Sequence, residues 1–128
     1  MIVGLGTDVV SIERIGELLR KYEGAFIERV CNDSEKGYLQ SCADITPKLA
    51  KLWAAKEAAV KALGTGFIEG ISFKDIELKH NSLGRPELEF KQKALDKLQQ
   101  LAGDKVNVFV SLSDDKPWAQ AVVIIEKI

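Results

Sequence analysis

The feature that most constrains the fold is one long helical segment, from residue 47 to about residue 63. Thr46 can cap its first turn, and Pro47 suits the first helical position because an amide donor is not needed there. Gly64 can adopt the left-handed conformation that commonly ends a helix. Alanines and large apolar residues fill most of the segment, so we expect it to be the main helix of the fold.

Charged residues interrupt this apolar helix. Glu57 and Lys61 lie one turn apart on its flank, in the same sector as Ala50 and Ala54, whose small side chains leave room for a ligand. An ordinary surface ion pair between Glu57 and Lys61 explains the same spacing without any ligand. Lys56 projects into the apolar stripe, where an unpaired ammonium is costly, although its long side chain can also extend to water.

The remaining segments are short. Residues 2–5 predict a strand that Gly6, Thr7 and Asp8 end, and a helix begins near Ser11. We expect further helices at 25–30, from Asp33 or Ser34 to about 41, and at 91–102, a strand pair at 76–80 and 87–90, and two final strands at 106–112 and 119–128. One α+β domain over residues 1–128 is the economical interpretation.

Length and composition exclude several classes of protein. The net charge of -1 gives no overall signal for nucleic-acid binding. No apolar run approaches the ~20 residues that span a bilayer, and the first residues lack the pattern of a secretion signal, so we expect a cytoplasmic protein without a membrane partner. Cys31 and Cys42 have no cluster of Cys or His around them, which predicts neither a zinc site nor a disulfide.

Asp8 supplies a second carboxylate for a candidate site. Its place after the first strand is typical of a turn residue or of a neighbour of a helix cap. If it lay beside Glu57, the two carboxylates would suit Mg²⁺, which proteins commonly hold through one or two carboxylates together with water and substrate phosphate.

The Gly64-Thr65-Gly66 loop follows the main helix. Its glycines allow close approach of the backbone to a ligand, or simply make a turn. Phosphate-binding loops usually precede a helix, where the amides and the dipole favour an anion. A pyrophosphate bound at this loop would therefore depend more on Lys61 and a cation than on the helix dipole.

Taken together, these segments resemble the holo-acyl-carrier-protein synthases, the small bacterial members of the phosphopantetheinyl transferase family. The resemblance is carried by GLGTDVVSIERI, by LWAAKEAAVKALGTG with GISFKDIEL, by the GRP turn, and by VSLSD before AQAVVIIE. These motifs follow the family order over nearly the whole chain. The resemblance implies the phosphopantetheinyl transferase fold, with a small antiparallel sheet packed with a long central helix.

The resemblance also implies an activity. A serine hydroxyl of an apo acyl carrier protein attacks the β-phosphate of coenzyme A, the 4′-phosphopantetheine arm moves to the serine, and adenosine 3′,5′-bisphosphate leaves. Asp8 and Glu57 match the Mg²⁺ ligands of the family, and Lys61 matches the lysine beside the pyrophosphate. A divalent cation and an ammonium stabilise the charge that develops on phosphoryl oxygens. The 64–66 loop would let the coenzyme lie close to the chain.

Two positions depart from the family pattern. Asp114 stands where many relatives have histidine, and it would orient water, accept a proton or serve as a polar turn residue. Leu52 stands where many relatives have arginine, so a contact to the nucleotide is missing, and Lys51 or a basic residue of another subunit would have to replace it. We expect His80 to be a surface residue rather than a metal ligand.

The resemblance further implies partners. Carrier proteins of this class are strongly acidic, and Arg14, Arg20 and Lys21 form a basic edge on the first helix, of which Arg14 matches a carrier-contact position. A solvated helix face explains the same charges. The family also implies a homotrimer with active sites between subunits. The apolar last two strands suit either a subunit interface or an internal core.

Two other functions are compatible with the sequence. A non-catalytic module of the same fold would bind carrier protein or nucleotide. Asp8, Glu57 and Lys61 argue against it, whereas Leu52 and Asp114 leave it open. Hydrolysis of coenzyme A or of a nucleotide pyrophosphate would release the leaving group without any carrier protein.

Overall fold

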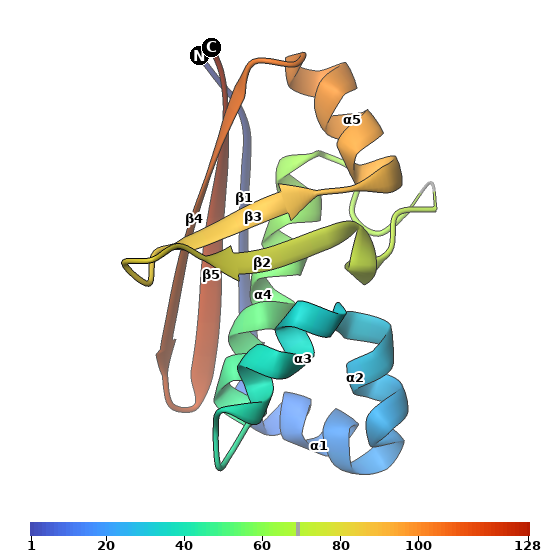
Figure 1. Cartoon of the computed structure of the whole chain (residues 1–128), viewed down its shortest axis with the longest axis vertical. Coiled ribbons are helices and arrows are strands. Elements are labelled where there is room, and N and C mark those ends of the chain that lie inside the picture. The colour runs from blue at the N-terminus through green and yellow to red at the C-terminus, as the bar shows by residue number, and fades with distance from the viewer. Residues whose placement is uncertain (69) are drawn as a thin grey trace.

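A three-stranded antiparallel sheet packs against one long helix, with a two-stranded hairpin and the shorter helices arranged around that helix (Figure 1). The computed structural model describes residues 1–68 and 70–128. Its elements are β1 (Ile2–Ser11), α1 (Ile12–Tyr22), α2 (Gly24–Val30), α3 (Asp33–Gln40), α4 (Thr46–Ala62), the 3₁₀ helix η1 (Phe73–Asp75), β2 (Ile76–His80), β3 (Pro86–Phe90), α5 (Gln92–Ala102), β4 (Val106–Asp115) and β5 (Trp118–Lys127). The predicted α+β class with small antiparallel sheets is confirmed. None of the helices in these two ranges has the length and apolar character that crossing a membrane requires.

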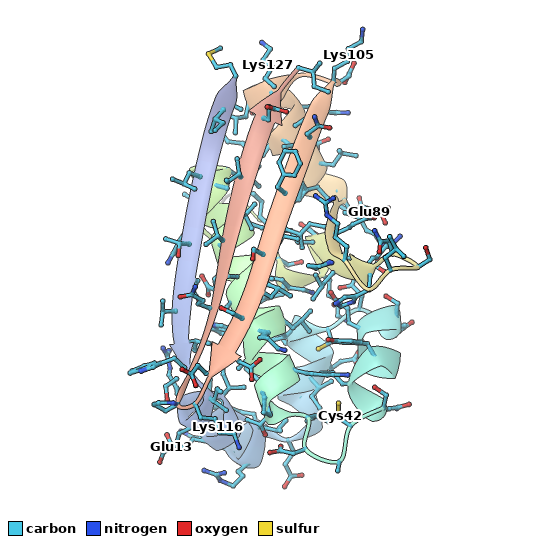
Figure 2. All side chains as sticks on the ribbon, turned by 90° about the vertical axis from the view of Figure 1, so that its left-hand side faces the viewer. Glu13, Cys42, Glu89, Lys105, Lys116 and Lys127 are labelled. Atoms are coloured by element: carbon cyan, nitrogen blue, oxygen red, sulfur yellow. The ribbon has the colours of Figure 1, made fainter. Side chains whose placement is uncertain are left out.

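The main sheet has the strand order β1-β5-β4 and presents one face to α4. Along β5, Ala119, Ala121, Val123 and Ile125 are buried, as the alternation of a half-covered strand requires. Among residues 1–68 and 70–128 no helix covers the opposite face, and Figure 2 shows the three strands in front with the rest of the chain behind them. Apolar side chains on this open face include Leu5, Val9 and Phe109, which are 65%, 59% and 41% exposed.

The glycines of β1 bring the strand into direct contact with the backbone of α4. A Cβ atom on Gly6 would lie 1.9 Å from the carbonyl oxygen of Ala58, and one on Gly4 would lie 2.3 Å from that of Ala62. The prediction that the strand ends at Gly6 was therefore wrong, since β1 continues to Ser11. Glycine within a strand here marks a close approach of two backbones rather than a turn.

Helix α4 is buried on nearly all sides. Its buried residues include Ala50 and Ala54, both fully inaccessible, so the gap expected beside these small side chains is filled by protein. Leu52 is also fully buried. Lys56 has no exposed surface either, which makes the alternative that its ammonium reaches water wrong. Only a narrow part of the helix, including Glu57 and Lys61, remains accessible.

The ends of α4 partly match the prediction. Thr46 is the first helical residue, and Ile45 occupies the cap position. The side chain of Asp44 accepts a hydrogen bond from the amide of Thr46 at 3.0 Å. Pro47 occupies the first turn as expected. Gly64 has the predicted left-handed conformation, with φ of 83°.

The other helix starts are similarly close to their predicted positions. Ser11 caps α1 through its hydroxyl, as the start near this residue suggested. Helix α3 is capped by Asn32, whose backbone amide donates to Glu35, and not by Asp33 or Ser34. Asparagine favours the cap position as aspartate and serine do, so three consecutive residues suit the cap, which explains the error of one or two residues.

Candidate active site

Three of the predicted site residues meet at the edge of the sheet formed by β1. Asp8 lies on β1 two residues after Gly6, on the side of the strand that faces α4, and it is not in a turn. Lys61 Nζ lies 3.0 Å from Asp8 Oδ1 and donates to the carbonyl oxygen of Thr7 at 3.0 Å. Lys61 therefore pairs with Asp8 across the two elements, so the simple surface pair with Glu57 does not explain the spacing on α4.

Glu57 lies close enough to Asp8 for their charges to interact. Burial raises the pKa of the Glu57 carboxyl above its ordinary value, and the negative charge of Asp8 raises it further, while Lys61 and Arg14 oppose these effects. The raised pKa therefore reflects first the loss of water around Glu57 and then the repulsion between the two carboxylates. Such a pair favours an additional positive charge.

The donor set suits a divalent cation that binds phosphate. Within residues 1–68 and 70–128, no group of three or more His, Cys, Asp or Glu side chains is arranged to hold a metal ion. A cation between Asp8 and Glu57 would thus have two protein carboxylates and would take its other ligands from water or substrate. This is the binding habit of Mg²⁺ in phosphate-handling sites, so these residues fit that ion.

The 64–66 loop borders Lys61 and is open to solvent. Cβ atoms on Gly64 or Gly66 would meet nothing within 4 Å, although both residues have positive φ. The amides of Thr65 and Gly66 both donate to the carbonyl oxygen of Val60 at 3.2 Å. The loop therefore offers a close backbone surface rather than free amide donors, and an anion here would depend on the ammonium of Lys61.

A cavity of about 410 Å³, which we did not predict, lies between α1, α2, α4 and η1. Its walls are mainly apolar and include Phe26, Trp53 and Phe73. The ring of Trp53 stacks on Phe26 at a centroid distance of 5.7 Å and lies tilted against Phe73 at 4.8 Å. Arg14 and Arg29 are its two cationic lining residues. Because the charge of Arg14 also acts on Glu57, this residue connects the cavity electrostatically to the carboxylate pair.

The basic residues of α1 do not form a single edge. Arg14 lines the cavity, and Lys21 Nζ lies 5.3 Å from the ring of Tyr22, another lining residue. Arg20 instead lines a separate groove with Thr46. Six residues on a helix correspond to about 1.7 turns, which places Arg20 about 120° around α1 from Arg14. Arg29, and not Arg20, is the second arginine beside the cavity. Its spacing of three residues from Phe26 on α2 was the sequence feature that could have predicted this position, because residues three apart share a helix face.

Asp114 lies on the opposite edge of the sheet from Asp8. It belongs to β4 rather than to a turn, and Lys51 Nζ lies 2.9 Å from its Oδ1. The chain therefore does not bring Asp114 into the cluster of Asp8, Glu57 and Lys61. The ammonium of Lys51 is engaged by this carboxylate within the chain.

His80 lies near the same edge and is exposed, as predicted for a surface residue. Its ring stacks on Tyr38 with a centroid distance of 4.7 Å, and Lys48 Nζ lies 4.1 Å from the centre of the Tyr38 ring. Partial burial lowers the pKa of His80, and the charges of Lys48 and Lys51 lower it further. These contacts explain the histidine without a metal.

Comparisons with known proteins identify the family of the chain. The family model described as the 4′-phosphopantetheinyl transferase superfamily matches residues 4–122. A holo-[acyl-carrier-protein] synthase of Ruegeria sp. (strain TM1040) is 43% identical over 98% of this chain and 90% of its own length. The crystal structure of the synthase from Neisseria meningitidis has a TM-score of 0.87 and 38% identity, covering 99% of this chain and 100% of that one.

A structure of the synthase from Bacillus anthracis, in complex with coenzyme A (3′,5′-ADP), is similar as well. Its TM-score is 0.82 at 32% identity, and the match covers 100% of this chain and 99% of that chain. The family match spans the carboxylates, the lysine and the loop described above. The chain therefore belongs to the 4′-phosphopantetheinyl transferase superfamily.

Proposed function

We propose that this protein transfers the 4′-phosphopantetheine group of coenzyme A to a serine of an apo acyl carrier protein, with Mg²⁺ assistance and release of adenosine 3′,5′-bisphosphate. The observation that carries the proposal is the meeting of Asp8, Glu57 and Lys61 beside an open glycine loop. Relatives named as holo-[acyl-carrier-protein] synthases match nearly the whole chain, and one was solved with coenzyme A. These similarities support the same substrates here, and a cytoplasmic location.

Each residue of the cluster has a distinct task. Asp8 and Glu57 would hold Mg²⁺, which supplies positive charge to the phosphoryl oxygens as the reaction proceeds. Lys61 is about half exposed, with its side chain held by Thr7 and Asp8, so its ammonium is oriented and still accessible to a pyrophosphate. The ordered donor stabilises negative charge without having to reorganise during the reaction.

The cavity and its cations form the proposed docking site for the carrier protein. Arg14 and Arg29 fit acidic side chains of the carrier, and the aromatic walls fit an apolar side chain of the same partner. Lys21 lies at the margin, over the ring of Tyr22. The combination of an apolar centre with surrounding charge is typical of a protein–protein interface.

Reversing the charge of Arg14 should weaken the binding of the carrier protein. We expect Arg14→Glu to raise KM for the carrier protein by about tenfold or more, because the introduced carboxylate would repel the acidic side chains of the carrier. Arg20→Glu is the matched variant on the same helix, and we expect about a twofold change at most, because Arg20 lines a different groove. Initial rates at varied carrier concentration measure both values. Equal effects of the two reversals would contradict docking at the cavity.

A homotrimer with shared sites fits the open face of the main sheet. Leu5 and Val9 on β1 and Phe109 on β4 leave apolar surface exposed, and such surface favours burial against another chain. Asp8 and Asp114 lie on opposite edges of this sheet, so an assembly would let the Asp114 edge of one chain approach the Asp8 edge of another. That arrangement would give Asp114 a place in the site.

Placing a charge on this open face should prevent assembly. We expect Leu5→Glu to shift the protein from a trimer to a monomer in analytical ultracentrifugation and to reduce transferase activity in parallel, because an unpaired carboxylate in an apolar interface is costly. Thr7→Glu would test a less apolar position of the same strand face. A wild-type protein that is monomeric and fully active would contradict the shared-site arrangement.

Intact-protein mass spectrometry tests the activity itself. An apo acyl carrier protein is incubated with this protein, coenzyme A and Mg²⁺, with a chelator in the control. We expect a chelator-sensitive gain of one phosphopantetheine mass on the carrier. Adenosine bisphosphate released without any carrier would indicate hydrolysis, and binding of folded carriers without any gain would indicate a non-catalytic module.

A further inference from the structure

Lys56 forms the centre of a buried polar cluster that the proposed reaction does not use. Its side chain has no exposed surface, and Glu35 is 1% exposed. Lys56 Nζ lies within hydrogen-bonding distance of four oxygens: the carbonyls of Val30 at 2.6 Å and Phe73 at 2.9 Å, Glu35 Oε1 at 2.7 Å and Asn32 Oδ1 at 3.2 Å. One ammonium thus connects α4 to the end of α2, to α3 and to η1.

Glu35 extends the cluster to the hairpin. Its Oε1 accepts from the amide of Asn32 at 2.7 Å as well as from Lys56, and its Oε2 accepts from the amide of Leu78 on β2 at 2.7 Å. Burial lowers the pKa of Lys56, while the charge and the hydrogen bond of Glu35 oppose that shift. Every oxygen of this carboxylate has a fixed donor, so the cluster permits little movement of the segments that it joins.

A gain in stability does not by itself explain this pair. Removing two charges from water costs much of what their attraction returns, and apolar residues of similar volume often stabilise a core equally well. The positions of the acceptors suggest another reason. The two carbonyls belong to Val30 and Phe73, which both line the cavity, and Trp53, one turn before Lys56 on α4, lines it too. Lys56 therefore joins three walls of the same cavity.

We propose that Lys56 is a positioning residue that sets the width of this cavity and thereby the docking of the carrier protein, an inference that rests on the proposed function. An apolar side chain at this position would leave the carbonyls of Val30 and Phe73 and the Glu35 carboxylate without their common donor. The end of α2 and η1 would then shift relative to Trp53. Glu57 and Lys61 instead face Asp8 on β1, so coenzyme A would keep its contacts.

The first test is a comparison of Michaelis constants in Lys56→Met. We expect KM for the carrier protein to rise by about tenfold, and KM for coenzyme A to stay within about twofold of the wild-type value. Leu98→Ala on α5 is the matched control, because it removes a core side chain that does not line the cavity. The control should lower the melting temperature and leave both constants unchanged. A Lys56→Met protein that behaves like the control overturns the proposal, as does an equal rise in both constants.

The second test does not depend on activity. Trp53 and Trp118 are the two tryptophans, so in a Trp118→Phe background the fluorescence reports on the cavity wall alone. We expect acrylamide to quench Trp53 more strongly after Lys56→Met, and no such change after Leu98→Ala. The two proposals fail by different results. If the wild-type protein modifies no carrier, the proposed function is wrong. If Lys56→Met leaves the quenching of Trp53 unchanged, the positioning role is wrong.

Glu35→Asp serves if Lys56→Met does not fold. It keeps both charges and withdraws the acceptor from Lys56 by one methylene group. We expect a smaller rise in KM for the carrier and a smaller increase in quenching, both in the same direction. A folded Glu35→Asp protein with wild-type values of both quantities would overturn the proposal.

Discussion

Glu57→Gln is expected to reduce phosphopantetheine transfer by about a hundredfold or more, because a metal ion contributes several kcal/mol of charge stabilisation in the transition state. The amide keeps the size of the side chain and removes the charge that would bind Mg²⁺ beside Asp8. Mass-spectrometric rates measured over a range of Mg²⁺ concentrations test this. Glu87→Gln on β3 is a control with the same chemical change at an exposed position, and it should retain wild-type rates. Wild-type turnover of Glu57→Gln at ordinary Mg²⁺ would exclude Glu57 as a ligand.

The same substitution should affect stability in the opposite direction. Burial and the charge of Asp8 raise the pKa of Glu57, so its ionised form is less favourable in the folded than in the unfolded chain. The metal-free protein should therefore gain stability as the pH falls through this raised pKa and lose it as the pH rises. Glu57→Gln removes this penalty, so we expect a slightly higher melting temperature at neutral pH in the presence of a chelator. A lower melting temperature would mean that Glu57 stabilises the fold instead.

Activity should follow the opposite pH dependence. A carboxyl with a raised pKa becomes protonated at a higher pH than an ordinary glutamic acid, so binding of the proposed Mg²⁺ to the wild-type protein should weaken as the pH falls through that value. Added Mg²⁺ should shift the loss to lower pH, since metal and proton compete for the same oxygens. A rate that does not change with Mg²⁺ across this range would contradict the competition.

Gly6→Ala is expected to have the largest effect on the fold. A Cβ atom there would lie 1.9 Å from the carbonyl oxygen of Ala58, and neither partner can move aside without displacing β1 from α4. Overpacking of a core typically costs about 1–3 kcal/mol and occasionally more, and backbone contacts lie at the high end. Because Asp8 follows two residues later on the same strand, transfer should fall together with stability. Chemical denaturation and the transfer assay measure the two effects.

Gly37→Ala provides the matched control for this substitution. A Cβ atom on Gly37 would meet nothing within 4 Å, and the residue lies in α3 with ordinary helical backbone. Alanine should stabilise that helix by about 0.5–1 kcal/mol. If both glycine substitutions leave stability and activity unchanged, β1 and α4 do not pack as closely as described.

Much of the fold could be predicted because it depends on local patterns. The hairpin of β2 and β3, the amphipathic α5 and the extent of α4 follow from periodicity and from turn residues such as Gly64. The length of β1 could not be predicted in this way. In a single sequence, glycines such as Gly4 and Gly6 indicate a turn. The structure shows instead that they are glycines because a side chain at either position would collide with the backbone of α4.

The site shows a similar division. The sequence predicted Asp8, Glu57 and Lys61 as partners, but the ion pair of Lys61 with Asp8 depends on the packing of β1 against α4. Arg14 and Arg20 are close along the chain but lie on different sides of α1, so their spacing in the sequence does not predict a common surface. The cavity arises from four elements distant in sequence, so no local pattern predicts it.

The burial of α4 on nearly all sides has a consequence for motion. Its backbone hydrogen bonds are covered by the sheet and the surrounding helices, so few of them can open by local fluctuation. The amide hydrogens of α4 should therefore exchange with solvent mainly through global unfolding, and those of the exposed junction between α1 and α2 (residues 21–25) much sooner. Glu57 and Lys61 thus lie on a segment that is expected to exchange slowly, whereas the proposed docking cavity also has walls from the faster-exchanging α1 and α2.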